Sequence, residues 1–260
     1  MAEPPIAWDK ADLWGPPRPR RAMGLRDLAL GVVLVVLAQV LAAGIALWQV
    51  ATGGTDGAEA IASSPSVLVG GLLLLWAAFA GTPLLVARRT GRKLGEVIGL
   101  RRPTAAAIAW GAGLGLALRG ASSIAGWLAQ SLGMPPAQNT SWLLQVESAA
   151  VVLVLMLGTA FVGPVMEEIF FRGLMLRSVL ASERVPERAR EAVAVVVSSV
   201  LFGLAHFTTA DGPGLFVIAQ TGLLGAIFAV VALRKGLTAP IAAHVVFNTT
   251  GVLVLVGSGG

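Results

Sequence analysis

Seven long apolar stretches dominate the chain, and short segments that hold most of the charged residues separate them. The stretches predict helices at 28–50, 66–87, 105–130, 149–180, 190–208, 214–233 and 238–256. A helix needs about 20 apolar residues to cross the hydrocarbon core of a bilayer, and most of these stretches reach that length. The fourth is the least regular, because Pro164 and then a pair of glutamates interrupt it. The pattern therefore predicts an all-α, polytopic membrane helix bundle with about seven transmembrane helices.

The composition also indicates a membrane protein. Hydrophobic residues make up 56% of the chain, charged residues 13%, and the mean hydropathy is +0.80. A soluble domain contains about 25% charged residues, so this chain has too few polar side chains to cover a water-facing surface. The absence of cysteine excludes a disulfide framework, a thiolate zinc site and a cysteine nucleophile.

Basic residues lie in alternate connections between the predicted helices. They precede the first helix, follow the second, surround the fourth-to-fifth connection and follow the sixth, whereas the connections 51–65, 131–148 and 209–213 contain none. The positive-inside rule then predicts a plasma-membrane protein with a cytoplasmic N-terminus and an external C-terminus. Arginine clusters placed in this way are typical of orientation signals rather than of a nucleic-acid footprint, so no nucleic-acid partner is expected.

The same pattern divides the chain into three parts. Residues 1–27 are rich in Pro, Trp and Arg and contain no apolar run, so they are predicted to form a cytoplasmic tail rather than a cleaved signal. Residues 28–148 are predicted to form the N-terminal transmembrane helices, and 149–260 a C-terminal transmembrane region. In the N-terminal helices, Gly111 and Gly115 have the spacing of close small-xxx-small helix packing.

The ionisable residues of the C-terminal region fall into three short blocks. In hydrocarbon an ionisable side chain costs from about 2.5 kcal/mol upward, so such residues usually face an interior cavity and mark a functional site. The second and third blocks contain the only two histidines of the chain. The blocks are Glu167-Glu168-Ile-Phe-Phe-Arg172, Phe202-Gly-Leu-Ala-His206 and His244-Val-Val-Phe-Asn248.

Helical spacing separates the two glutamates. Glu168 and Arg172 are four residues apart, with the acid on the N-terminal side, which is the better order for an ion pair. Glu167 is rotated by about 100° from its neighbour and points elsewhere. We therefore expect Arg172 to hold Glu168 while Glu167 faces the pocket. Phe202 and His206, and likewise the histidine and asparagine of the third block, each share one helix face.

Simpler explanations exist for each feature taken alone. A Glu-Glu-xxx-Arg sequence at a helix end is often a solvated ion pair, and His244 with Asn248 is compatible with hydrogen bonding between helices. Arg119 lies in the middle of the third predicted helix and is expected to snorkel or to form an ion pair, with Glu147 as a candidate partner. Pro164 is expected to kink the fourth helix and to free a backbone carbonyl.

Taken together and in this order, the three blocks resemble the signature motifs of the CPBP family. This family contains the CAAX-protease and bacteriocin-processing membrane proteins related to the Ras-converting enzyme, also called Abi proteins. Its motifs are Glu-Glu-xxx-Arg, Phe-xxx-His and His-xxx-Asn (or Asp) on successive membrane helices, and all three occur here within residues 149–256.

The resemblance implies a membrane-embedded endopeptidase, with membrane lipid and a peptide or protein substrate as its partners. It implies that Glu167 is the general base on the attacking water and that His206 assists it. It further implies that His244 and Asn248 stabilise the oxyanion, while Glu168 and Arg172 brace the site. These roles match the needs of peptide hydrolysis for a base, an oxyanion donor and an acid for the leaving amine.

The sequence leaves the cofactor and two rival functions open. Glu167, His206 and His244 are a plausible ligand set for a divalent metal such as zinc, with water as the fourth ligand, but the same groups can also work without a metal. A proton-coupled transporter would also place Glu and His in helices, although it would show symmetry between halves. A non-catalytic membrane scaffold or immunity protein would keep the fold without the chemistry.

The predicted topology also sets a geometric requirement. It places Glu167 near the cytoplasmic end of the fourth helix and His206 towards the outer end of the fifth, about 24 Å along the helix from Arg190. For the motifs to meet, both helices must extend past the lipid on the cytoplasmic side.

Overall fold

The computed structural model describes residues 22–53, 64–133, 146, 148–206 and 214–257. Every regular element in these residues is helical, which confirms the predicted all-α class. The long helices lie close to the predicted ranges. They are α1 (Leu25–Ala51), α3 (Pro65–Thr90), α5 (Ala105–Ser131), α9 (Arg190–Ala205), α10 (Gly214–Lys235) and α11 (Thr238–Gly257). A short helix α4 (Leu94–Ile98) follows α3, and a 3₁₀ turn η4 (Glu187–Ala189) precedes α9.

The fourth predicted helix is one long segment in which two π-helical turns interrupt the α-helix. Its parts are α6 (Ala149–Leu157), η2 (Gly158–Val162), α7 (Gly163–Glu168), η3 (Ile169–Met175) and α8 (Leu176–Leu180), of which η2 and η3 are π-helical. The predicted irregularity is therefore confirmed. Pi-helical turns are rare and frequently occur at functional sites, and here they flank the turn that carries both glutamates.

Five segments of the described residues are long and apolar enough to cross a membrane. They are Leu25–Ala51, Ser66–Thr90, Ala149–Leu180, Val217–Lys235 and Thr238–Gly257. The predicted number of about seven is not confirmed, for two physical reasons. The helix α9 has only 16 residues, fewer than the roughly 20 that a span needs. The helix α5 contains Arg119 and several glycine and serine residues, which lower its hydropathy.

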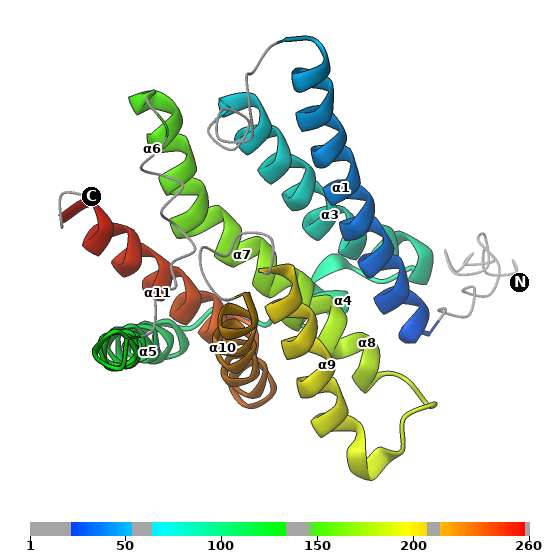
Figure 1. Cartoon of the computed structure of the whole chain (residues 1–260). Coiled ribbons are helices and arrows are strands. Elements are labelled where there is room, and N and C mark those ends of the chain that lie inside the picture. The colour runs from blue at the N-terminus through cyan, green and yellow to red at the C-terminus, as the bar shows by residue number, and fades with distance from the viewer. Residues whose placement is uncertain (1–21, 54–63, 134–145, 147, 207–213, 258–260) are drawn as a thin grey trace, which may run out of the picture.

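The helices pack in pairs around the long fourth segment. Helix α1 packs along α3, α9 along α10, and α5 along α11. The segment from α6 to α8 runs between these pairs and contacts α3, α9 and α11, as Figure 1 shows in green. The fourth segment is therefore the one element on which side chains from the other pairs can converge.

Glycine allows the α5–α11 pair to approach closely. A Cβ atom on Gly111 would overlap the carbonyl oxygen of Ala239, and one on Gly115 would overlap that of Ala243. The predicted small-xxx-small packing is thus confirmed, and its partner is the helix that carries the third motif.

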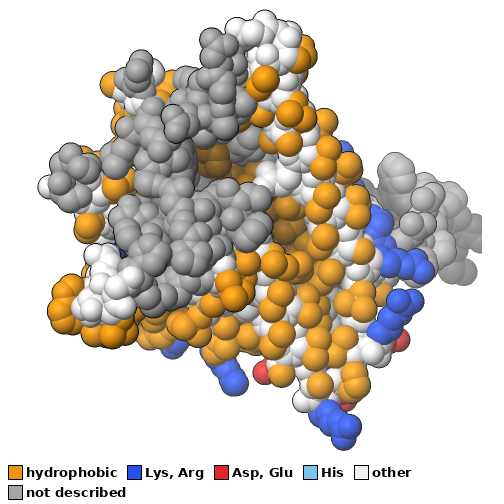
Figure 2. Space-filling view, viewed as in Figure 1, with side chains coloured by type: hydrophobic (Ala, Val, Ile, Leu, Met, Phe, Trp, Pro, Cys, Tyr) orange, Lys and Arg blue, Asp and Glu red, His pale blue; other side chains and the backbone are white. Residues whose placement is uncertain are grey.

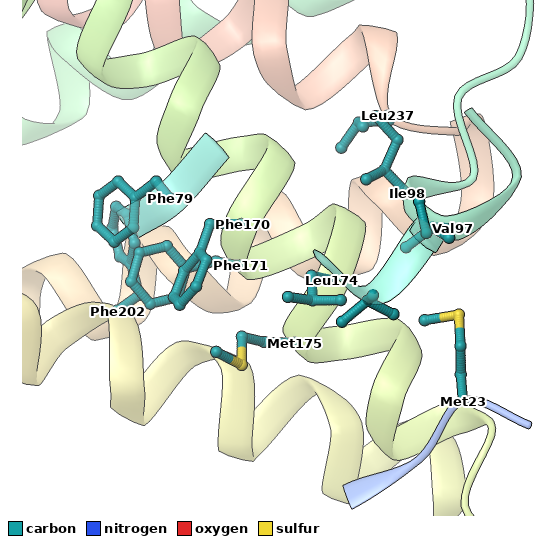
Figure 3. Close-up of a cluster of buried hydrophobic side chains, with 12 residues drawn as sticks. Met23, Phe79, Val97, Ile98, Phe170, Phe171, Leu174, Met175, Phe202 and Leu237 are labelled. Atoms are coloured by element: carbon teal, nitrogen blue, oxygen red, sulfur yellow. The ribbon is translucent and has the colours of Figure 1, made fainter. Parts of the chain in front are cut away.

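Aromatic side chains fill the core beside the motifs (Figure 3). Phe79 of α3 lies 4.7 Å from Phe170, and Phe171 lies 5.1 Å from Phe202 of α9, between ring centroids. All four side chains are buried. The phenylalanine of the Phe-xxx-His motif is therefore a packing residue that ties α9 to the fourth segment.

The outer surface is largely apolar. Figure 2 shows hydrophobic side chains over most of the visible face, with Lys and Arg gathered along its lower and right edges. Large apolar side chains such as Val36, Val200 and Leu253 are more than half exposed. Together with the membrane-length helices, this surface makes the chain an integral membrane protein.

Candidate active site

The structure brings the three motifs together around Glu167. This residue lies in α7, whereas His206 caps the C-terminal end of α9 and His244 lies in α11. Oε2 of Glu167 is 3.9 Å from Nε2 of His206 and 3.8 Å from Nε2 of His244. The fourth segment continues 13 residues beyond Glu167 to Leu180, about 20 Å at helical rise, which matches the length of α9 up to His206. The motifs do meet, and the extension of both helices past the lipid on the cytoplasmic side stays a prediction.

The second glutamate is buried and holds two partners. Oε1 of Glu168 accepts a hydrogen bond from Nη1 of Arg172 at 2.8 Å and a second from Nδ1 of His244 at 2.9 Å. The side chains of Glu168 and Arg172 are fully buried. The predicted ion pair between them is confirmed. The contact with His244 was not predicted, and it links the first motif directly to the third.

Arg172 is held by contacts that sequence spacing did not indicate. Its Nη2 donates to the carbonyl of Gly225 in α10 at 3.1 Å, and its guanidinium lies 4.3 Å from the ring centroid of Phe202. A Cβ atom on Gly225 would lie 3.3 Å from Nη2 of Arg172 and 3.1 Å from the ring of Phe202. Because a buried charge needs several partners, Gly225 is part of the site although it has no side chain.

Hydrogen bonds fix which nitrogen of each histidine carries a proton. Nδ1 of His206 lies 2.8 Å from the carbonyl oxygen of Phe202, which can only accept, so Nδ1 is the donor. Nδ1 of His244 donates to the Glu168 carboxylate in the same way. In their neutral forms both rings therefore turn an acceptor, Nε2, towards Oε2 of Glu167.

These groups lack one positive charge. Two carboxylates and one guanidinium leave a net negative charge when both imidazoles are neutral, and Oε2 of Glu167 is buried without a hydrogen-bond partner among the described residues. This oxygen therefore needs a hydrogen-bond donor from outside the described residues, such as a bridging water.

Asn248 is held by the backbone of η2. Its Nδ2 donates to the carbonyl of Thr159 at 3.0 Å. In η2 the amide of Gly163 bonds to the carbonyl of Gly158, five residues earlier. The next bond in that register would join residue 164 to Thr159, but Pro164 has no N–H. The expected free carbonyl is therefore that of Thr159, and Asn248 occupies it with one of its two amide hydrogens.

Arg119 does not lie beside the two glutamates. Its Nε and Nη2 donate to the carbonyl of Phe247 at 3.1 and 2.7 Å, and its guanidinium lies 3.9 Å from the ring centroid of that residue. The candidate partner Glu147 lies outside the described residues. In the described part of the chain, Arg119 joins α5 to the turn of α11 that carries Asn248.

Trp76 of α3 is a site residue that the sequence did not reveal. A Cβ atom on Gly158 would lie 2.6 Å from its indole ring, and one on Gly163 would lie 3.8 Å from its Nε1 and 3.7 Å from Oε1 of Glu167. Trp76 and Glu167 therefore both lie close to Gly163. Within an apolar stretch, nothing distinguishes a tryptophan at a site from one that faces lipid.

The candidate metal ligands were tested against the geometry. Two ligands of a tetrahedral zinc ion, each about 2.0–2.1 Å from it, lie roughly 3.3 Å apart. The separations at Glu167 are 3.8 and 3.9 Å. Among the described residues, no group of three or more His, Asp or Glu side chains is arranged to hold a metal ion. As they lie, Glu167, His206 and His244 are too far apart to hold a tetrahedral zinc ion.

The fold and the site define a class: a helical integral membrane protein with a buried cluster of glutamates and histidines. Residues 149–250 match the family model described as Rce1-like, type II CAAX prenyl endopeptidase Rce1-like. This part of the chain, which carries all three motifs, is therefore similar to the CAAX-protease family of membrane endopeptidases. Comparisons with curated proteins and with solved structures gave no match.

Proposed function

We propose that the chain hydrolyses a peptide bond at or within the membrane, with a water molecule activated by Glu167 and His206. One observation carries the proposal. Oε2 of Glu167 lies within 4 Å of Nε2 of both His206 and His244, while Nδ1 of each ring is held by an acceptor. Gaps of this length are too long for direct hydrogen bonds and suit a bridging water.

The first step is attack by water on the substrate carbonyl. Glu167 accepts a proton from the water, and Nε2 of His206 orients the water by accepting its second hydrogen. The water oxygen bonds to the carbonyl carbon, and the carbonyl π electrons move to its oxygen. Positioned bases of this kind contribute roughly 10²–10⁴-fold to rate.

The second step stabilises the oxyanion and releases the amine. Nε2 of His244 is one candidate donor when the ring carries both protons, and the Glu168 carboxylate at 2.9 Å from Nδ1 fixes the orientation of that ring. The second amide hydrogen of Asn248 is the other candidate donor. The protonated Glu167 then gives its proton to the leaving nitrogen, the C–N bond breaks, and a carboxyl group and an amine result.

The two residues of the buried pair have supporting roles. Glu168 fixes the ring of His244, and Arg172 neutralises Glu168. The substrate is a peptide or protein segment, since the family is one of endopeptidases. Matched farnesylated and unmodified peptides of one sequence would decide whether a prenyl group is required.

Variants of the two water-activating residues test the proposal. Glu167→Gln and His206→Ala should each lower the cleavage rate of purified protein by about 10²-fold or more, because the water loses its base or its orientation. Glu183→Gln, an exposed glutamate after α8, is the matched control and should retain the wild-type rate. Expression and membrane insertion should be unchanged in all three. Full activity of Glu167→Gln would refute its role as base.

A further inference from the structure

A cavity lies between α4, α8 and the α10–α11 turn. Its volume is about 110 Å³, and three arginines line it: Arg101, Arg172 and Arg177. A single water needs only roughly 10–15 Å³ of such space, so the cavity has room for a larger group. No carboxylate is among the described residues that line it.

Arg177 is fixed in place at the cavity. Its Nε donates to the carbonyl of Val97 at 3.1 Å, which leaves the outer nitrogens of the guanidinium for other partners. Gly99 ends α4 with φ at +65°, and a Cβ atom there would overlap the Arg177 guanidinium. The glycine is thus needed both for the left-handed turn and for the close approach of the arginine.

Two of the three cavity arginines, Arg101 and Arg177, have no carboxylate partner among the described residues. Arg89 is paired with the buried carboxylate of Asp27 at 2.6 Å, in the manner of a structural ion pair. By contrast, Arg101 makes no hydrogen bond to the described residues. Nε of Arg172 is buried without a partner among them. A buried N–H group without a partner needs a hydrogen-bond acceptor, and Arg172 is one of the residues that line the cavity.

We propose that this cavity binds a phosphate group, supplied either by the headgroup of an anionic lipid or by a free phosphate. Arginine guanidiniums bind phosphate oxygens in pairs of parallel hydrogen bonds, and basic pockets between membrane helices are suited to anionic headgroups. The cavity lies at the end of the bundle where α3 and α10 end in Arg88, Arg89, Arg234 and Lys235. Figure 2 shows Lys and Arg side chains along the lower and right edges of the visible face. Binding here does not depend on peptide hydrolysis.

The test measures anion binding to the purified full-length chain in a neutral detergent. Inorganic phosphate and short-chain dihexanoyl phosphatidylglycerol are titrated separately, with dihexanoyl phosphatidylcholine as a zwitterionic reference, and the shift in unfolding temperature is followed. Saturable binding of phosphatidylglycerol alone supports a lipid headgroup. Saturable binding of phosphate as well supports a free phosphate group.

Charge-matched variants separate a built site from general attraction. The double variant Arg101→Gln and Arg177→Gln should weaken anion binding by about tenfold or more, because charge-assisted hydrogen bonds are lost. The control pair Arg184→Gln and Arg188→Gln removes the same charge from exposed positions outside the cavity and should bind like wild type. If the double variant fails to fold, Arg101→Gln alone serves, since it breaks no hydrogen bond to the described residues. An equal loss in the control pair, or no saturable binding by the wild type, would overturn the proposal.

Discussion

Replacing each glutamate of the first motif by glutamine should separate stability from chemistry. Glu168 is fully buried, and one of its oxygens accepts hydrogen bonds from Arg172 and His244 at 2.8 and 2.9 Å. Glu168→Gln removes the negative charge and leaves the buried guanidinium uncompensated. Glu167 is 17% exposed and its Oε2 has no hydrogen-bond partner among the described residues. Glu167→Gln therefore breaks no comparable interaction.

The magnitude follows from the burial of the pair. Removing one partner of a buried ion pair costs about 3–5 kcal/mol. For a chain of this size, each kcal/mol shifts the unfolding temperature by roughly 2–4 °C, so Glu168→Gln should unfold about 6–20 °C below wild type. Glu167→Gln should unfold within a few degrees of wild type. Both variants should lose most of their cleavage activity. Glu168→Gln should lose it because His244 is misplaced, and Glu167→Gln because the base is lost.

The assay is thermal unfolding of both variants and wild type in one detergent, followed by cleavage of one peptide. The reasoning would be refuted if Glu168→Gln unfolded at the wild-type temperature while Glu167→Gln was strongly destabilised. In that case the glutamate held by Arg172 would not be the structural one.

Three further changes test separate contacts. Gly225→Ala should lower the unfolding temperature by several degrees, because its Cβ would crowd Arg172 and Phe202. Its control is Gly113→Ala, whose Cβ would meet nothing within 4 Å and which should be neutral or slightly stabilising. Equal effects of the two variants on the unfolding temperature would contradict the packing argument. A strong chelator should leave cleavage unchanged and purified active protein should lack stoichiometric metal; about one equivalent of zinc with reversible inactivation would show that the metal-free mechanism is wrong. Asn248→Asp should lower the rate by about 10²–10³-fold, because a carboxylate repels the oxyanion and cannot donate to the Thr159 carbonyl; wild-type activity would remove Asn248 from the oxyanion site.

The helices were predictable because lipid imposes a simple rule on sequence. Each spanning segment must be apolar over its length, so boundaries such as 238–256 lie within a residue or two of the observed Thr238–Gly257. The Glu168–Arg172 pair was predictable for a similar reason, since helical periodicity places side chains four residues apart on one face. The roles of these residues in catalysis remain predictions.

Contacts between distant segments could not be predicted in this way. The carbonyls of Gly225 and Thr159, which hold Arg172 and Asn248, belong to backbone groups that carry no signal in the side-chain pattern. Trp76 lies at the site because Gly158 gives it space, and spacing within α3 does not show that. The free carbonyl near Pro164 was foreseeable, but its identity depends on the π-helical register of η2.

The most direct test of the central claim is peptide cleavage by the purified protein in ¹⁸O-labelled water. A quenched peptide library is incubated with wild type and with Glu167→Ala, and products are analysed by mass spectrometry. If Glu167 activates water, wild type should produce fragments with one ¹⁸O atom in the new carboxyl group, and Glu167→Ala should produce them at least about 10²-fold more slowly. Equal cleavage by the two proteins would contradict the assignment of Glu167. No cleavage by wild type across the library would favour a non-catalytic membrane scaffold.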